Sequence, residues 1–256
     1  MDYLKRFSLE GKNALVTGAS SEQGLCCGMA KALNGAGAKV AMLDISDRVH
    51  TLVESLGGEK AGFYSVQGDL TDASSREDAF EKVLQIFDDK LDILLNGAGI
   101  QFRKEAIDFP EDAWNRVVSI NLNATFFLSQ LAARNMINNG KGKIINIASL
   151  TSFVASRNIP AYSASKGGVM QLTKALSNEW CSLGVNVNAI APGYMITELT
   201  KDLVETDLGK SYTARIPAGR WGISEDLMGP VVFLASEASD YMSGVTIPVD
   251  GGFLGF

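Results

Sequence analysis

The feature that constrains the fold most is a regular alternation of short apolar, strand-forming runs with helical runs. The strand-forming runs occupy residues 13–17, 39–43, 62–66, 91–95, 143–148, 185–190 and 245–249. Helical patterns lie at 25–34, 47–56, 73–88, 111–138, 161–183 and 224–235, the last with Ser224 as its expected N-cap. Such an alternation is typical of parallel strands joined by crossover helices. It predicts an α/β fold: a Rossmann-type, doubly wound, parallel seven-stranded sheet with helices on both faces.

No linker, charge run or internal repeat divides the 256 residues, so we expect a single domain over residues 1–256. Residues 195–215 are polar and less regular than the rest of the chain. This stretch is interpreted as a helical lid over a substrate site, since lids that exclude water are common in enzymes.

Composition excludes several classes of function. The chain has 29 acidic and 23 basic residues without a basic cluster, so neither nucleic acid nor a membrane is an expected partner. The first twelve residues are charged and lack the apolar run of a signal peptide, which predicts a cytoplasmic protein. Three cysteines give no disulfide framework, and a single histidine, His50, gives no support for a Ser-His-Asp hydrolase or a metal site.

A tyrosine and a lysine four positions apart open the helical run that starts at residue 161. Positions four apart share one face of a helix, so the ammonium of Lys166 is expected beside the phenol of Tyr162. A fixed cation should lower the tyrosine pKa from its ordinary value of about 10. Ser149 ends the preceding apolar run, where open α/β sheets bind ligands. Together they predict an acid–base site; the alternative is a half-buried tyrosine with a solvated lysine.

A small, polar turn at residues 18–24 joins the first strand to the first helix. Backbone N–H groups at a helix start attract anions, and glycine allows close approach, so this turn is expected to hold phosphate. Asp44 ends the second strand, where a carboxylate can accept hydrogen bonds from ribose hydroxyls and repel a 2′-phosphate. We therefore predict NAD rather than NADP. The alternative role of Asp44 is to cap the turn that follows it.

Several segments resemble motifs of the short-chain dehydrogenase/reductase family, and the resemblance covers nearly the whole chain. Residues 17–24 match the TGxxxGxG turn of that family in part, Asp69 matches its adenine-contacting aspartate, residues 96–99 resemble its NNAG segment, and residues 192–197 match its PGxVxT segment. The resemblance implies one dinucleotide-binding and catalytic domain, an NAD(P)-dependent oxidoreductase acting on CH–OH groups, and a homotetramer. The implied cofactor contacts are Gly18, Ser20, Gln23, Gly24, Asp44, Asp69, Leu70, Asn96, Ala98, Gly99, Tyr162, Lys166, Pro192, Gly193, Met195 and Thr197.

The same resemblance implies a catalytic tetrad of Asn121, Ser149, Tyr162 and Lys166. Tyr162 would exchange a proton with the substrate oxygen, and Ser149 would hold that oxygen. Lys166 would lower the pKa of the tyrosine and bind the nicotinamide ribose. Asn121 would position a water for proton relay; the alternative is an asparagine satisfied by its local backbone.

Two positions depart from the family pattern: the middle glycine of the phosphate turn is Glu22, and the second asparagine of NNAG is Gly97. At about 6 Å from the pyrophosphate, a carboxylate would be repelled by roughly 3 kcal/mol per unit charge at an effective dielectric near 20. A side chain turned to solvent avoids that cost, and we expect this arrangement for Glu22. Glycine at 97 is compatible with any backbone angle.

The C-terminal third is most similar to the sugar-acid dehydrogenases of the family, those for 2-deoxygluconate, 2-dehydro-3-deoxygluconate and gluconate. A sugar acid needs a cation for its carboxylate, and Arg103 and Arg157, with Asn158, lie on loops expected to border the site. Gln101 and Trp221 are further candidates for contacts with hydroxyl groups. Two alternatives remain open: a dehydrogenase or reductase for another ketone, polyol, ketoacyl or steroid substrate, and a relative that binds dinucleotide without catalysis.

The last six residues, 251–256, are apolar for a free tail. Such a surface usually finds cover. We expect that cover within the chain or at an interface between subunits.

Overall fold

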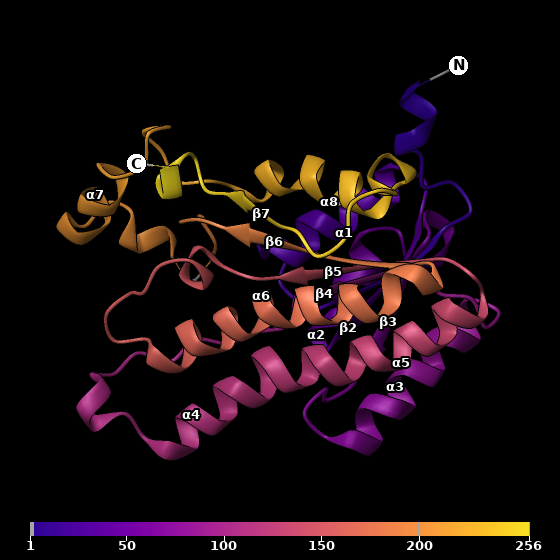
Figure 1. The fold of residues 1–256 in the computed structure, drawn as a ribbon, viewed down its shortest axis with the longest axis horizontal. Coiled ribbons are helices and arrows are strands. Elements are labelled where there is room, and N and C mark those ends of the chain that lie inside the picture. Colours follow the sequence, from indigo (N-terminus) through magenta and orange to yellow (C-terminus); the bar gives the residue numbers. More distant parts are fainter. Residues whose placement is uncertain (1–2, 199, 256) are drawn as a thin grey trace.

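The computed structural model describes residues 3–198 and 200–255, so Leu199 of the expected lid and Phe256 of the apolar tail lie outside the described residues. Within these ranges, seven parallel strands form one sheet in the order β3-β2-β1-β4-β5-β6-β7 (Figure 1). The strands are β1 (Asn13–Thr17), β2 (Lys39–Asp44), β3 (Phe63–Gln67), β4 (Ile93–Asn96), β5 (Gly142–Ile147), β6 (Val185–Pro192) and β7 (Thr246–Val249). The predicted doubly wound parallel sheet is confirmed.

Helices connect the strands and cover both faces of the sheet (Figure 1). They are α1 (Leu25–Gly35), α2 (Arg48–Ser55), α3 (Ala73–Ile86), α4 (Glu111–Val118), α5 (Ala124–Asn138), α6 (Pro160–Trp180), α7 (Asp207–Thr213) and α8 (Met228–Ala235). The helix expected over 111–138 is divided into α4 and α5 by a π-helical segment, Ser119–Asn123.

Two apolar layers hold the sheet between the helices. Val16 faces the layer that contains α1, α2 and α8, with side chains such as Leu33 and Val231. Leu15, its neighbour in β1, faces the opposite layer with α3, α5 and α6, including Leu128. Successive residues of a strand point to opposite faces, so each strand of the centre is buried on both sides. This explains why the central strands read as continuous apolar runs.

One local expectation is wrong. Ser224 is not the N-cap of the last helical run, which begins as a 3₁₀ turn, Ser224–Leu227. The cap is Ile223, whose N–H donates to Oδ2 of Asp226 at 2.8 Å. The carboxylate three residues into the turn does the capping, and the hydroxyl of Ser224 instead donates to Glu225.

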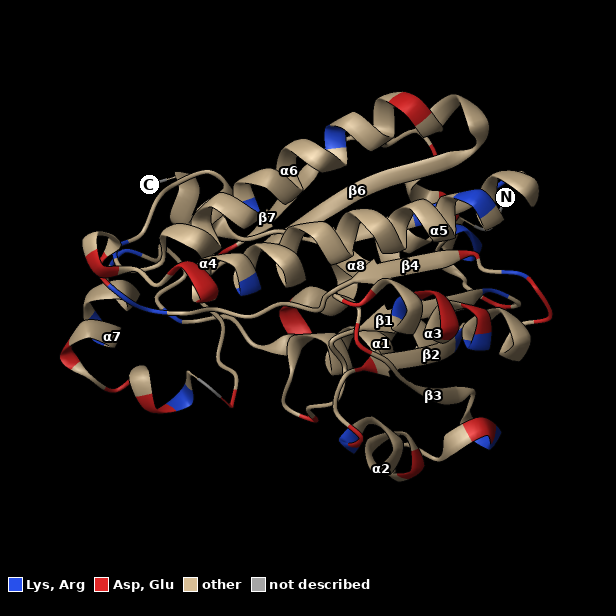
Figure 2. Ribbon diagram, turned by 90° about the horizontal axis from the view of Figure 1, so that it is seen from below, with Lys and Arg blue, Asp and Glu red and all other residues tan. Residues whose placement is uncertain are grey.

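None of the helices in the described part of the chain has the length and apolar character needed to cross a bilayer. Figure 2 shows basic and acidic residues interspersed over helices and loops rather than gathered on one basic face in this view. His50 is exposed, and its Nδ1 lies 2.9 Å from Oγ of Ser65.

Candidate active site

Tyr162 and Ser149 come from different elements, and their side chains meet at the carboxyl edge of the sheet. Tyr162 lies in the first turn of α6; Ser149 follows β5 and caps a 3₁₀ turn by accepting from the N–H of Thr151 at 3.1 Å. Burial raises the pKa of Tyr162, and a side-chain hydrogen bond with Ser149 opposes the rise. Two hydroxyl groups in mutual reach can together bind one oxygen atom of a ligand.

Lys166 lies one helical turn after Tyr162, with Nζ 5.8 Å from the centroid of the tyrosine ring. Nζ donates a 2.6 Å hydrogen bond to the carbonyl oxygen of Ile147 at the end of β5. Burial lowers the pKa of Lys166 to about 8. The expected fall in the pKa of Tyr162 is wrong for this structure. Both groups are desolvated, and the ammonium is bound to the backbone rather than directed at the phenol oxygen.

Asn121 occupies the π-helical segment Ser119–Asn123, a distortion frequent at functional sites. Its side chain is fully buried and bonded to other elements. Oδ1 accepts from the N–H of Ile100 at 2.8 Å, while Nδ2 donates to the carbonyl oxygen of Ile100 at 3.0 Å and to Oγ of Ser165 at 3.1 Å. Local backbone therefore does not account for this asparagine. It ties the loop after β4 to α6.

Gly99 and Ser152 show how closely Asn121, Lys166 and Ser149 are packed. A Cβ built on Gly99 would lie 3.2 Å from Oδ1 of Asn121 and 3.7 Å from Nζ of Lys166, so both side chains reach this loop. Sequence reasoning missed Ser152, whose Oγ donates to the carbonyl oxygen of Lys166 at 2.7 Å and accepts from the N–H of Ser149 at 3.3 Å. The capping spacing, a serine three residues after Ser149, could have indicated it.

The turn between β1 and α1 has the properties of an anion site. Gly18 has a φ of 72°, and a Cβ there would lie 2.7 Å from Cα of Ala98, so only glycine fits. The N-cap of α1 is Gly24, which has no side chain to accept hydrogen bonds from the first turn. None of the described residues of that turn is acidic. The first N–H groups of α1 are thus without a capping side chain. Ser20 is half-buried, whereas Gln23 and Glu22 are exposed, which agrees with a solvent-directed Glu22.

Asp44, the last residue of β2, and Asp69, which comes shortly after β3, lie at the same edge of the sheet. Oδ2 of Asp44 accepts from the N–H of Ser20 at 3.1 Å, and Oδ1 accepts from the N–H of Ser46 at 3.0 Å. Asp44 therefore caps the next turn and also fixes the phosphate turn. Each carboxylate oxygen can accept a second hydrogen bond, so capacity for ribose hydroxyls remains. Oδ1 of Asp69 accepts from the N–H and the hydroxyl of Thr71, at 2.8 and 2.7 Å.

The side chain of Asn96 is buried and used within the sheet rather than at the cleft. Its Nδ2 donates to Oγ of Ser129 at 2.8 Å and to Oδ1 of Asn146 at 2.9 Å. Any contact of Asn96 with a cofactor would therefore involve its backbone.

Gly97, which departs from the family pattern, is enclosed on two sides. A Cβ built on it would overlap Sγ of Cys26 and lie 2.9 Å from the carbonyl oxygen of Thr17. The N–H groups of Gly97 and Ala98 donate to Oγ1 of Thr17 at 3.0 and 3.1 Å. Cys26 thus occupies the space beside position 97, which sequence reasoning did not foresee because the two residues lie far apart in the chain.

The segment after β6 is closely packed. A Cβ on Gly193, which follows Pro192, would lie 2.6 Å from Cα of Asp250. Met195 is buried and forms an isolated bridge with Gly222. Oγ1 of Thr197 lies 3.0 Å from Oγ1 of Thr200. The backbone of this segment therefore has a fixed path past the carboxyl edge.

The expected substrate residues lie on two loops that are joined by their backbones. The N–H of Lys104 donates to the carbonyl oxygen of Asn158 at 2.9 Å. Arg103, Arg157, Asn158 and Gln101 are all exposed.

Trp221 is wrong as a ligand contact, because it is 3% exposed and its Nε1 donates to Oγ1 of Thr213 at 2.9 Å. It belongs to an apolar, largely aromatic cluster that includes Leu150, the residue after Ser149. In that cluster, Tyr212 of α7 stacks on Tyr194 with ring centroids 4.6 Å apart, and Phe253 lies 5.5 Å from Tyr194. Phe253 is buried against its own chain, which accounts for the cover of that part of the tail.

Comparison with known proteins gives consistent results. The family model described as enoyl-(acyl carrier protein) reductase matches residues 18–254. The chain is 47% identical to a 2-dehydro-3-deoxy-D-gluconate 5-dehydrogenase of Dickeya dadantii, covering 98% of each chain. It is 39% identical to a gluconate 5-dehydrogenase of Gluconobacter oxydans, again covering 98% of each. The solved structure of a gluconate 5-dehydrogenase of Burkholderia cenocepacia, in complex with NADP and tartrate, has a TM-score of 0.93 at 37% identity and covers 99% of each chain.

Proposed function

Because the chain belongs to the short-chain dehydrogenase/reductase family and is an NAD(P)-dependent oxidoreductase, we propose that it transfers a hydride between nicotinamide and a sugar acid of the 2-dehydro-3-deoxygluconate type. The reacting group is a secondary alcohol in one direction and a ketone in the other. The convergence of Tyr162, Ser149 and Lys166 at one edge of the sheet carries the proposal. The 47% identical relative supports the class of substrate.

The residues at the carboxyl edge fit a dinucleotide. The close approach of Gly18 to Ala98 and the uncapped start of α1 suit a pyrophosphate, which the first N–H groups of that helix would bind. We propose NAD as the cofactor, because the Asp44 carboxylate can accept from ribose hydroxyls and would repel a 2′-phosphate. The relative from Burkholderia cenocepacia binds NADP, so both cofactors belong in the test.

Bound nicotinamide supplies or accepts the hydride; the chain provides the acid–base groups. Tyr162 exchanges the proton of the substrate oxygen, and Ser149 holds that oxygen through its hydroxyl. In this proposal Lys166 binds the nicotinamide ribose through its ammonium, whose charge depends on pH because burial lowers the pKa of this group to about 8.

Asn121 acts through its backbone in this proposal. Its side-chain oxygen and amide hydrogens are already bonded to Ile100 and Ser165. Its carbonyl oxygen accepts from Oγ1 of Thr125 at 2.9 Å, and in this proposal the same oxygen accepts a hydrogen bond from the relay water.

Arg103 and Arg157 are proposed to bind the carboxylate of the sugar acid, and Asn158 one of its hydroxyls. All three are exposed, and the bond between Lys104 and Asn158 keeps the two loops together. A guanidinium can bind a carboxylate with two parallel hydrogen bonds. The stretch 195–215 is proposed as the lid, anchored by the stacking of Tyr212 on Tyr194.

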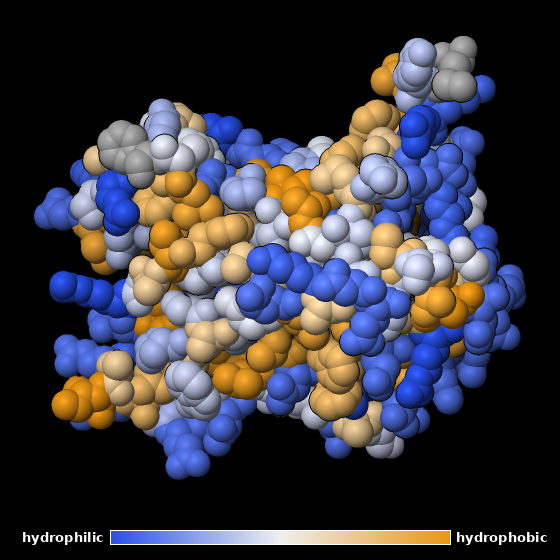
Figure 3. All heavy atoms as spheres, viewed as in Figure 1, coloured by the Kyte–Doolittle hydropathy of each residue, from blue (hydrophilic) through white to orange (hydrophobic). Residues whose placement is uncertain are grey.

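We also propose a homotetramer. A groove between α5 and α6 is lined by the apolar side chains of Leu122, Phe126, Phe127, Leu172 and Ala175. Figure 3 shows apolar atoms gathered in the lower half of this face of the molecule, where Figure 1 places α5 and α6. Contiguous exposed apolar surface favours association. Light scattering at micromolar protein concentration tests it; a monomer at all concentrations would exclude this use of the groove.

The decisive experiment follows oxidation or formation of NADH and NADPH across a panel of keto-sugar acids, polyols, steroids and ketoacyl thioesters. We expect activity with NADH and 2-dehydro-3-deoxygluconate-type acids. Tyr162→Phe should abolish turnover and leave NADH binding nearly unchanged. Binding of NADH without activity on any member of the panel would favour a non-catalytic relative, and wild-type rates in Tyr162→Phe would refute the role of the tyrosine.

A further inference from the structure

Arg76 of α3 is a buried cation whose charge is not neutralised by a carboxylate. The residue is 8% exposed, and no acidic side chain in residues 3–198 or 200–255 forms an ion pair with it. One guanidinium nitrogen donates to the carbonyl oxygen of Leu70 at 2.9 Å. The guanidinium carbon lies 5.0 Å from the ring centroid of Phe127 on α5, and Nε has no hydrogen-bond partner.

A buried arginine of this kind is costly to retain. Burying an unpaired charge is unfavourable, and a hydrophobic residue of similar volume often gives equal or greater stability. The contact with the Phe127 ring offsets part of the cost, because the ring face attracts cations. Stability alone therefore does not explain an arginine here. A hydrophobic residue at this position would lose the hydrogen bond from Arg76 to the Leu70 carbonyl. This hydrogen bond is therefore the feature to be explained.

Leu70 belongs to the turn that follows β3 at the carboxyl edge of the sheet. The N–H of Asp69 in this turn donates to Oγ of Ser75 at 2.8 Å, and Asp69 also accepts from Thr71. These bonds fix the first half of the turn from the start of α3. The bond from Arg76, the residue after Ser75 on the same helix, fixes the peptide plane after Leu70 from the buried side. Together these hydrogen bonds fix the backbone conformation of Asp69 and Leu70 at the carboxyl edge of the sheet.

We propose that Arg76 is a positioning residue for the adenine end of the dinucleotide: it holds the Leu70 carbonyl so that the Asp69–Leu70 turn is already formed before the cofactor binds. This inference rests on the proposed dinucleotide site. Without the guanidinium, the turn must be ordered at the expense of binding free energy, so affinity falls for ligands that carry adenine. Ligands that carry only the nicotinamide half are unaffected.

The test uses full-length Arg76→Met and Arg76→Lys, with Arg134→Met as control because Arg134 is an exposed arginine on α5. Calorimetric titration measures the Kd of NADH and of reduced nicotinamide mononucleotide, which lacks the adenosine half. We expect Arg76→Met to weaken NADH binding about tenfold or more, with no change for the mononucleotide. Arg76→Lys keeps a cationic donor on a flexible stem and should lie between wild type and Arg76→Met. Arg134→Met should match the wild type for both ligands.

Thermal denaturation identifies any variant that does not fold, in which case Arg76→Lys carries the comparison. Equal weakening of both ligands, or unchanged NADH affinity in a folded variant, overturns the positioning role. A wild-type protein that binds neither NADH nor NADPH overturns the proposed function as well, and this outcome is distinct because it does not depend on any substitution.

Discussion

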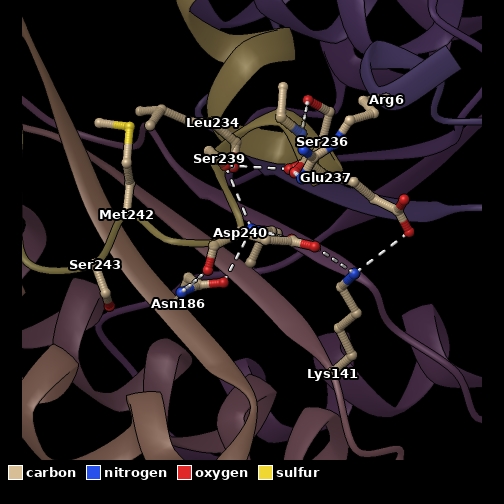
Figure 4. A network of polar contacts seen from close by, with 12 residues as sticks. Arg6, Lys141, Asn186, Leu234, Ser236, Glu237, Ser239, Asp240, Met242 and Ser243 are labelled. Carbon is tan, nitrogen blue, oxygen red and sulfur yellow. Dashed lines mark hydrogen bonds and ion pairs between the residues drawn. The ribbon is translucent and has the colours of Figure 1, made fainter. Parts of the chain in front are cut away.

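Replacing Asp240 with asparagine removes the counter-charge of a buried lysine at the opposite end of β5 from Ser149. The side chain of Lys143 is 5% exposed, and its Nζ lies 2.9 Å from Oδ1 of Asp240. The same ammonium donates to Oδ1 of Asn186 at 2.9 Å and to Oγ of Ser239 at 3.3 Å. Figure 4 shows Asp240 and Asn186 close together, and Lys141 joined by dashed lines to both Asp240 and Glu237. Burial lowers the pKa of Lys143, and the hydrogen bond and charge of Asp240 oppose that shift.

The size of the effect follows from the two ways in which Lys143 can respond. Removing one partner of a buried pair costs roughly 3–5 kcal/mol. Alternatively, the lysine loses its proton. From an ordinary pKa of 10.5, deprotonation costs about 5 kcal/mol at pH 7 and about 2 kcal/mol at pH 9. Because the lysine can always lose its proton instead, the cost of burying its unpaired charge cannot exceed the cost of deprotonation at that pH. The Asp240 side chain is 37% exposed, so water screens part of the pair. We expect a loss of about 3 kcal/mol at pH 7 and at most about 2 kcal/mol at pH 9.

Urea denaturation followed by circular dichroism, at fixed protein concentration, measures the free energy of unfolding at both pH values. Glu237→Gln is the matched control, because it removes the same charge from the same turn. Its partner Lys141 lies 3.4 Å away, with both side chains about half exposed. Such a pair contributes about 1 kcal/mol or less. Equal losses for the two variants at pH 7, or a loss in Asp240→Asn that does not shrink at pH 9, would refute this reasoning.

Three further predictions concern the proposed active site. Burial holds the pKa of Lys166 at about 8 in the folded protein against 10.5 unfolded, so between these values the unfolded chain binds more protons and stability rises with pH. The wild type should gain up to about 3 kcal/mol from this group between pH 8 and 10.5, and Lys166→Met should lack that gain in urea titrations across the range. Glu22→Gly should tighten NADH binding, by less than about tenfold because the exposed carboxylate is screened; fluorescence titration giving equal affinities would show that the carboxylate points away from the pyrophosphate. Gly97→Ala should lower the free energy of unfolding by about 1–3 kcal/mol and weaken NADH binding, since its Cβ overlaps Cys26; Gly167→Ala, with open space around its Cβ, is the control and should be neutral or slightly stabilising in the same assays.

The central strands could be predicted because each is buried on both faces and is therefore a nearly continuous apolar run. Phe63–Gln67 and Gly142–Ile147 differ from the expected ranges by only one residue at either end. The π-helical segment Ser119–Asn123 could not be predicted in this way. Its residues are helical in pattern, and the distortion depends on bonds between Asn121 and the loop at Ile100, 21 residues away.

The site residues show the same division. Tyr162 and Lys166 were expected to lie together because helical spacing alone brings them to one face, and Nζ does lie over the tyrosine ring. The direction of the tyrosine pKa was wrong, because desolvation depends on what surrounds both groups and leaves no trace in the spacing. Trp221 was misassigned for a similar reason: its partner Thr213 and its burial depend on how the segment before it folds back.

The buried polar groups near the proposed site show how the fold remains stable although the site contains a buried lysine. Lys166 is buried with a carbonyl oxygen as its hydrogen-bond acceptor, which costs stability at neutral pH. Between the sheet and α6, Asn96 of β4 donates to Asn146 of β5, and Asn146 donates to Thr173 of α6 at 3.0 Å, so the amide nitrogens of both asparagines are paired. Satisfied networks of this kind strengthen one another in a low dielectric. The scaffold that fixes β4, β5 and α6 is therefore separate from the groups proposed to react, and substitutions at Tyr162 should change chemistry far more than they change the fold.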